Sequence, residues 1–240
     1  RRDAARTAAV SSPPQNRDLQ AEGANTARLR GIETHVADID KRLKGEFPLY
    51  AAIASPAPIT VEEAQKDLAS DEALIQTFDT DAGFKPLPEE TFVWVITKTD
   101  VRWVRSDLGT KALQERVAAL RCGLDRAGEW VWSEEKYRWL ARKPSCDALR
   151  PEGLAIREPL PFNPAIAHEL YKGLLGDVGN LIKGKHLLIV ASGALTSLPF
   201  QVLVTKPPVP GQDYRSLAWL AREHALSVLP SVASLKALRR

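Results

Sequence analysis

The sequence has no methionine, not even at its first position, and holds two cysteines and four histidines among its 240 residues. Because position 1 is an arginine, we expect the chain to be the interior of a longer protein, so that an upstream targeting signal would not be seen. No apolar run reaches the ~18 residues that a membrane helix needs. The sequence therefore predicts no membrane partner.

Signals for metal and nucleic-acid binding are missing as well. There is no C-x-x-C pair, and the scattered histidines give no zinc-ligand spacing with the cysteines. The net charge of +3 is small, and lysine and arginine are interleaved with acidic residues rather than gathered in a basic run with aromatic residues. These absences predict no cofactor, no metal and no nucleic-acid partner.

The two cysteines, Cys122 and Cys146, could in principle pair as nucleophiles with His168, His186 or His224, but no sequence pattern brings such a pair together. We therefore interpret both cysteines as structural. They flank the least regular segment of the chain, so we expect them to lie near each other, within reach of a disulfide. The compartment stays open, with a small preference for the cytoplasm, where both thiols would remain reduced.

A long helix is predicted at residues 18–46, after a polar lead-in that ends near residue 16. Five apolar residues alternate spacings of three and four and so form one narrow, coiled-coil-like stripe. They are Leu29, Ile32, Val36, Ile39 and Leu43. Charged residues fill the other faces. Since the stripe of a lone helix would stay in water, it needs a neighbouring helix, and one upstream of this chain is a candidate.

Residues 59–162 are predicted to be rich in β-strands. Strands are expected at residues 72–78, 91–97 and 101–105, the last two joined by a tight turn. Trp94 and Trp103 alternate with their neighbours as residues of a sheet with one buried face do. We therefore expect these aromatic residues to belong to the core rather than to a ligand site.

Helices and one irregular segment are predicted around these strands. Thr60 and Glu63 fit a capping box, which would begin a short helix at residue 61. Thr110 is expected to cap a second helix. Residues 125–162 show no clear periodicity, so we expect a long loop with short helical turns there.

Residues 163–240 change to alternating helix and strand. Asn163 and the proline after it predict the start of a helix that ends at Gly184. The uninterrupted apolar run at 186–190 is typical of a central strand in a parallel sheet. A further strand is expected at 224–230, followed by a helix with Ser231 as its cap. This order predicts an α/β fold.

Ser192 follows the apolar strand and is a candidate nucleophile. A nucleophile elbow has the pattern G-x-S-x-G, and this chain has Val190 in place of the first glycine. The residues after Ser192 include Pro199 and do not predict an immediate helix. We therefore interpret Ser192 as part of a turn. Leu198, Pro199 and Phe200 are expected to anchor the following loop in the core beside the sheet.

The segment from residue 162 to 239 resembles the opening of a CHAT domain, the caspase-like module found together with TPR repeats. The matching residues occur in the order of the family's motifs and are His168-Glu169-Leu170-Tyr171, Gly193, Leu195, Leu198-Pro199-Phe200 and Leu229-Pro230-Ser231. The upstream strands also resemble the family's N-terminal part, so the resemblance covers residues 60–240. One departure is that the family usually has Pro-Asp where this chain has Ala191-Ser192.

The resemblance implies an α/β, caspase-like three-layer module that is cut short, preceded by a long N-terminal helix and a small antiparallel β-rich region. It divides the chain into a helical linker (1–58), the β-rich part (59–162) and the start of the caspase-like sheet (163–240). In the family, a histidine and a cysteine that follow later strands attack a peptide carbonyl. By that order both lie beyond residue 240. No residue here is therefore assigned a catalytic, cofactor-binding or metal-binding role.

The implied function is that of the N-terminal fragment of a cysteine-peptidase module, with a protein or peptide as partner and helical repeats upstream in the same chain. The alternative is a non-catalytic interaction scaffold with the same fold. A histidine and a cysteine after later strands would distinguish the peptidase from the scaffold. With those strands absent, we expect the isolated chain to expose a sheet edge and part of an apolar face.

Overall fold

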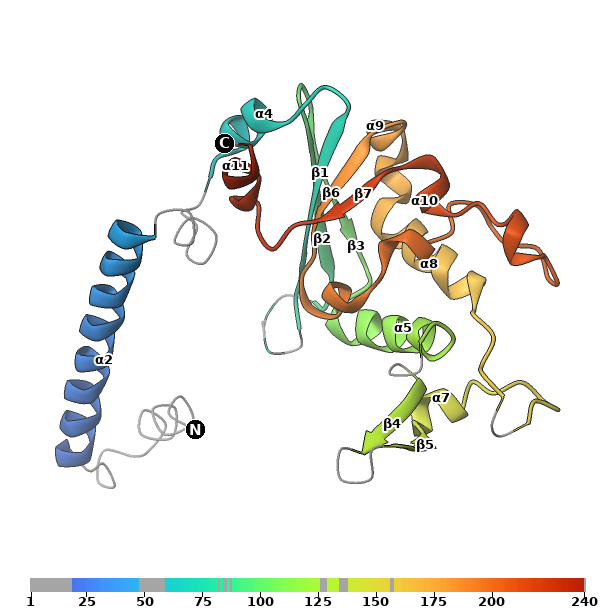
Figure 1. Ribbon diagram of the computed structural model, residues 1–240, viewed down its shortest axis with the longest axis horizontal. Helices are drawn as coiled ribbons and strands as arrows, with labels where there is room; N and C mark the ends of the chain where they lie inside the picture. The colour runs from blue at the N-terminus through green and yellow to red at the C-terminus, as the bar shows by residue number, and fades with distance from the viewer. Residues whose placement is uncertain are drawn as a thin grey trace. The chain divides into compact units, whose positions relative to one another are not determined.

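The computed structural model describes two compact units, residues 1–57 and 58–240. The described residues are 19–47, 59–81, 83, 86, 88–125, 129–133, 138–155 and 158–239 (Figure 1). The expected lead-in and the linker between the units lie outside the described residues. Within the described part, no helix combines the length and the apolar character that crossing a membrane requires.

The first unit contains the helix α2, Leu19–Glu46, which confirms the helix expected at residues 18–46. Its stripe is open to solvent: Ile32, Val36 and Ile39 are 37%, 50% and 43% exposed. Lys44 in the last turn complements the negative end of the helix dipole. The stripe is therefore left uncovered by the described residues of this unit.

The second unit is built on a five-stranded mixed sheet with the order β3-β2-β1-β6-β7. The strands are β1 (Glu72–Asp79), β2 (Thr91–Thr97), β3 (Val101–Ser106), β6 (His186–Val190) and β7 (Leu226–Val228). β1, β2 and β3 form an antiparallel meander, whereas β6 runs parallel to both β1 and β7. The expected strands are confirmed, β6 as a central strand of the parallel part.

Helices cover both faces of this sheet, as in α/β folds generally (Figure 1). On one face, α5 (Thr110–Cys122), α8 (Pro164–Leu175) and α9 (Gly179–Ile182) close the larger core. On the other face, α4 (Val61–Asp67) and α11 (Ser234–Leu238) close a smaller one. Successive residues of β1 divide between them, since Ala73 and Ile75 enter the larger core and Leu74 the smaller.

The helix expected from Pro164 to Gly184 is present but interrupted. The Asn163 side chain accepts the amide N–H groups of Ala165 and Ile166 at 3.1 and 3.2 Å, which confirms it as the N-cap. A 3₁₀ turn, η2 (Gly176–Val178), separates α8 from α9. Glycine is a poor helix former, so the glycines in and beside this turn account for the break.

Of two other helix caps that the sequence predicts, one is confirmed and one is wrong. The capping box before α4 is confirmed, because the Thr60 hydroxyl accepts from the Glu63 amide at 3.2 Å and the Glu63 carboxylate accepts from the Thr60 amide at 3.0 Å. The cap expected at Thr110 is wrong. Gly109 is the N-cap of α5, and the Thr110 hydroxyl donates instead to the Asp79 carboxylate.

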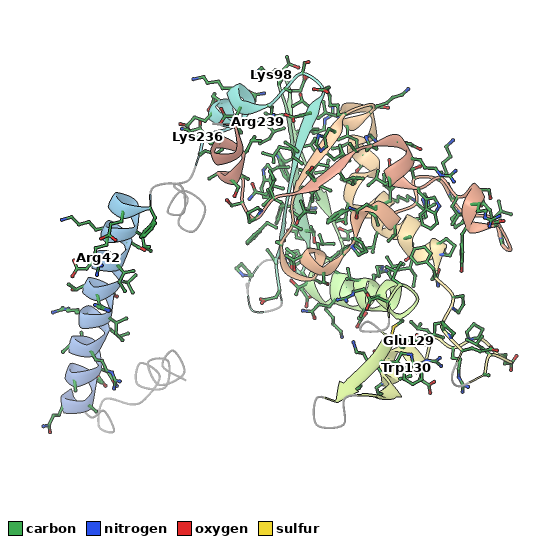
Figure 2. The ribbon with its side chains drawn as sticks, in the orientation of Figure 1. Arg42, Lys98, Glu129, Trp130, Lys236 and Arg239 are labelled. Atoms are coloured by element: carbon green, nitrogen blue, oxygen red, sulfur yellow. A yellow bond between two sulfur atoms is a disulfide. The ribbon has the colours of Figure 1, made fainter. Side chains whose placement is uncertain are left out.

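The C-terminal helix α11 is tied to the start of β1. The Ser231 hydroxyl accepts from the Ser234 amide at 3.2 Å, although Ser231 lies outside the cap position. The Arg239 guanidinium pairs with the Glu72 carboxylate. Burial tends to raise the pKa of Glu72, but hydrogen bonds from the Ala69 amide and Arg239 outweigh it, so this pKa lies below its ordinary value. Figure 2 shows Arg239 at this end of the unit.

The loop after β6 is anchored as expected. It forms two 3₁₀ turns, η3 (Gly193–Ser197) and η4 (Phe200–Val202). Leu198 and Phe200 are 4% and 2% exposed and belong to the same core as β6 and α8. Leu198-Pro199-Phe200 therefore marks where the chain re-enters the core.

The expectation for residues 125–162 is confirmed only in part, because a short helical turn is present as expected but a two-stranded hairpin stands where a loop was expected. This segment contains a two-stranded hairpin, β4 (Trp130–Ser133) and β5 (Arg138–Arg142), and the short helix α7 (Pro144–Asp147). A buried ion pair between Arg142 and Glu129 and the disulfide at Cys146 order it. Apolar periodicity could not reveal it, because polar and covalent contacts replace a periodic core there.

Candidate functional site

Four polar side chains meet where β1 and β6 end, and we call them the hydroxyl–carboxylate cluster. They are Thr77 and Asp79 of β1, Thr110 at the start of α5 and Ser192 after β6. Asp79 accepts the Ser192 hydroxyl at 2.7 Å and the Thr110 hydroxyl at 2.6 Å. The Ser192 amide donates to the Thr77 hydroxyl at 2.9 Å.

The position of this cluster follows from strand direction. β1 and β6 are parallel neighbours, so their carboxyl ends share one edge of the sheet. Ligands of open α/β folds bind at this edge. The cluster was not predicted from the sequence, although a polar residue at the end of one buried strand and another soon after a second strand are visible signals. What was missing was the pairing of β1 with β6, which lie more than 100 residues apart.

The cluster does not make Ser192 a nucleophile. A nucleophilic serine needs a base, most often an imidazole that a third group orients. Here the Ser192 hydroxyl donates directly to a carboxylate, and its amide is bonded to Thr77. The turn interpretation is confirmed in this sense, although a 3₁₀ turn does begin directly at Gly193, contrary to the expectation. The cluster's role is to join the ends of two strands and one helix.

Gly193 lies against the hydroxyl–carboxylate cluster, and a side chain at this position should destabilise the fold. Its φ of +50° favours glycine, and an added Cβ would lie 2.7 Å from both Asp79 carboxylate oxygens. That carboxylate is held by two hydroxyls and cannot move aside freely. Gly193→Ala should therefore lower the free energy of unfolding by about 2 kcal/mol, measured by denaturant titration.

Gly184→Ala is the matched control for this prediction. Gly184 also has a positive φ, +70°, but no atom lies within 4 Å of an added Cβ. This variant should show only the backbone cost, about 1 kcal/mol. Equal losses in the two variants would contradict the steric role of the cluster.

The three histidines of the second unit serve as links between elements. His168 Nδ1 lies 2.9 Å from the Val204 carbonyl, His186 Nε2 lies 2.9 Å from the Ser227 hydroxyl, and His224 Nδ1 lies 2.9 Å from the Lys185 carbonyl. His224 is 8% exposed. The geometry thus assigns these imidazoles to structural hydrogen bonds.

The cysteines are bonded to each other. Cys122 at the end of α5 and Cys146 in α7 form a disulfide with a Cα–Cα distance of 5.4 Å, and both are buried. Their expected proximity is confirmed. Neither thiol is free, so the possible pairing of either cysteine with a histidine as a catalytic dyad is not formed. Structural disulfides persist in oxidising compartments, which counts against the small preference for the cytoplasm.

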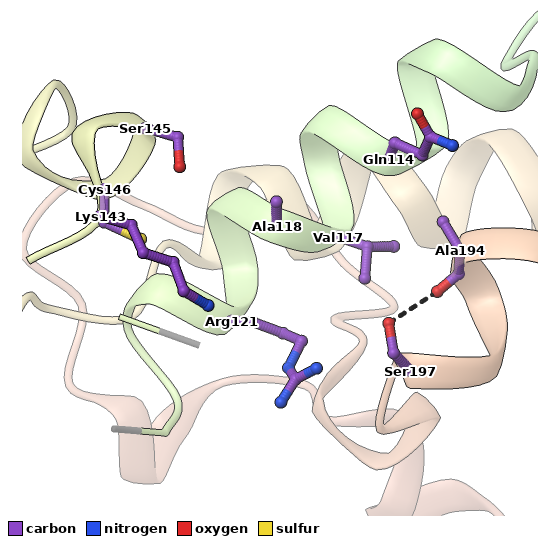
Figure 3. Close-up of a pocket in the computed structure, with 9 residues that line it drawn as sticks. All are labelled: Gln114, Val117, Ala118, Arg121, Lys143, Ser145, Cys146, Ala194 and Ser197. Carbon is purple, nitrogen blue, oxygen red and sulfur yellow. Dashed lines mark hydrogen bonds between the residues drawn. The ribbon is translucent and has the colours of Figure 1, made fainter. Parts of the chain in front are cut away.

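A pocket of about 260 Å³ lies beside this disulfide, between α5, α7 and η3 (Figure 3). Its polar groups are partly engaged within the chain. The Arg121 guanidinium pairs with Asp125 at 3.1 Å, and the Ser197 hydroxyl donates to the Ala194 carbonyl at 2.9 Å. The residues lining this pocket include no histidine, so it offers no pair of a serine or cysteine with an imidazole base.

The aromatic residues of β2 and β3 are more exposed than expected. Trp94 is half-buried and Trp103 is 57% exposed, so their placement in a buried face is wrong. Val93 and Val95, on the opposite side of β2, enter the core instead. The tryptophans lie on the same face of the sheet as Ile96. Helices α4 and α11 cover this face around Ile96 but leave the tryptophans exposed or half-buried.

We call the uncovered part of this sheet face the aromatic face. It consists of Phe78, Phe92, Trp94 and Trp103, which the strand register places side by side. The Phe92 ring centroid lies 5.9 Å from that of Trp94 and 6.1 Å from that of Trp103. Exposed apolar patches of this kind mark interaction surfaces. This face lies on β1, β2 and β3, away from β7, so it is not the exposure expected where the sheet is cut short.

Among the described residues, no group of three or more histidine, cysteine, aspartate or glutamate side chains could hold a metal ion. No family model, curated protein or solved structure matches the chain.

Proposed function

We propose that this chain is the N-terminal fragment of a CHAT-type, caspase-like cysteine-peptidase module. The observation that supports the proposal is the place of the motif residues in the fold. Leu195, Leu198, Phe200 and Leu229 are at most 7% exposed and pack around β6. These four residues of the motif are therefore part of the α/β core.

In this proposal the chain carries no catalytic dyad of its own. Cys122 and Cys146 are bonded to each other, and the histidines of the second unit hold structural hydrogen bonds. The catalytic histidine and cysteine would follow later strands of the sheet, beyond residue 240. The partner would be a protein or peptide, with TPR-like helical repeats upstream.

The second candidate is a non-catalytic interaction scaffold, and the aromatic face favours it. Trp103 and Phe78 are 57% and 47% exposed on a rigid sheet. Aromatic side chains provide large contact areas and are enriched in protein interfaces. Both candidates share the fold, and they differ in whether peptide hydrolysis occurs.

The test is a peptide-library assay under reducing conditions, with the 240-residue chain beside a longer chain that includes the downstream residues. We expect no thiol-dependent cleavage by the 240-residue chain and cleavage by the longer one. An inactive longer chain would favour the scaffold. Cleavage by the 240-residue chain that Cys122→Ala or Cys146→Ala abolishes would overturn both proposals, because one of these cysteines would then be the nucleophile.

A further inference from the structure

Helix α2 needs a partner that the described residues of its unit do not supply. Its apolar stripe is exposed, with Val36 50% accessible. Gly23 and Gly31 lie inside the helix and weaken it, since glycine costs about 1 kcal/mol relative to alanine in a helix interior, and Gly45 lies in its last turn. No atom lies within 4 Å of a Cβ added at any of the three, so neighbours do not offset that cost. Most helical stability in proteins comes from packing an apolar face.

The spacing of the stripe defines its heptad positions. Steps of three and four place Leu29, Val36 and Leu43 at position a, and Ile32 and Ile39 at position d. The flanking positions then differ in character, because one holds basic residues and the other acidic residues. Position g holds Arg28 and His35, whereas position e holds Glu33 and Asp40.

These charges distinguish the two directions in which copies of α2 could associate. In a parallel, in-register assembly, position g of one helix lies beside position e of the next heptad on its neighbour. Arg28 would then meet Glu33, and His35 would meet Asp40. In an antiparallel assembly, g lies beside g and e beside e, so that basic residues meet basic ones and acidic residues meet acidic ones. The charge pattern therefore complements itself only in the parallel arrangement.

We propose that α2 is a parallel, in-register coiled-coil segment through which copies of this chain associate. The partner of the apolar stripe is the same stripe of another copy. Leucine at two of the three a positions, with isoleucine at both d positions, favours more than two strands, so the preferred assembly has three or four chains. This proposal does not depend on the function proposed for the second unit.

The first test measures mass by light scattering over a range of chain concentrations. The 240-residue chain should show three or four times the 26.4 kDa of one chain. Val36→Asp places a charge in the seam and should weaken association by at least about 100-fold, because burying an unpaired charge costs several kcal/mol. Ala37→Asp, on the outer face at position b, should leave the mass unchanged. A wild-type chain of 26.4 kDa at every concentration would overturn the proposal.

The second test asks whether the associated helices run parallel and in register. Asn25 occupies a d position, so Asn25→Cys would place thiols of neighbouring chains together only in a parallel, in-register assembly. Mild oxidation should then give a covalent dimer. Thr34→Cys, on the outer face at position f, should not. Cross-linking at neither position, or equally at both, would overturn the parallel arrangement.

The third test asks whether the charges at positions e and g of α2 select the partner helix. Glu33→Lys with Asp40→Lys makes the e and g positions alike in sign and should dissociate the assembly. Adding Arg28→Glu and His35→Glu restores opposite signs and should restore the mass. Failure of the four-fold variant to reassociate, with the second unit still melting as in the wild type, would show that the charges do not select the partner.

Discussion

Reduction of the Cys122–Cys146 disulfide should lower the free energy of unfolding of the second unit by about 3.5 kcal/mol, from the loop-closure entropy of a bridge between residues 24 positions apart. The bridge joins the end of α5 to α7, and α7 follows directly after β5. Its loss would release the hairpin from the larger core. Denaturant titrations with and without reductant measure the effect.

The control for this prediction is Cys122→Ala combined with Cys146→Ala. This variant should unfold at nearly the denaturant concentration of the reduced wild type, and reductant should not change it further. Oxidised and reduced wild type with the same unfolding midpoint would contradict a stabilising bridge. Thiol titration of the native oxidised chain should find no free cysteine.

The sheet could be predicted strand by strand because its signals are local. The alternation in β2 and the uninterrupted apolar run of β6 depend only on neighbouring residues. The pairing of β1 with β6 joins segments more than 100 residues apart, and no local pattern encodes it. The same limit explains Trp103. Alternation indicates that a strand has two faces, but only the placement of α4 and α11 decides which part of a face is covered.

The hydroxyl–carboxylate cluster shows a related limit. Ser192 was a candidate nucleophile from its place after a strand. The absence of a glycine at position 190 correctly excluded a nucleophile elbow. Its partner Asp79 could not be identified, because the two residues meet only through the long-range pairing of β1 and β6. Thr110 was expected to cap its own helix, the usual local role of threonine. The Thr110 hydroxyl donates instead to the carboxylate of Asp79 in β1, which is a stronger acceptor than a backbone group.

Arg142→Ala should have the largest effect of any single substitution in the hairpin segment, a loss of about 3–5 kcal/mol in the free energy of unfolding. The Arg142 and Glu129 side chains are 3% and 6% exposed, and their Nε–Oε1 distance is 2.7 Å. The guanidinium also donates to the Glu158 carbonyl and lies 5.3 Å from the centroid of the Trp130 ring. Figure 2 labels Trp130, the first residue of β4, and Glu129 directly before it. Removing Arg142 would leave the Glu129 carboxylate buried without its partner.

Two variants separate the buried charge from lost packing. Arg142→Met combined with Glu129→Leu removes both charges while keeping apolar volume, and should cost less than Arg142→Ala, because an apolar replacement of a buried ion pair is often neutral. Arg150→Ala removes the partly exposed pair with Asp147, 3.5 Å apart, and should change stability by less than about 1 kcal/mol. If the double variant were as unstable as Arg142→Ala, the loss would come from the contacts of the arginine with Glu158 and Trp130. An uncompensated carboxylate would then not be its cause.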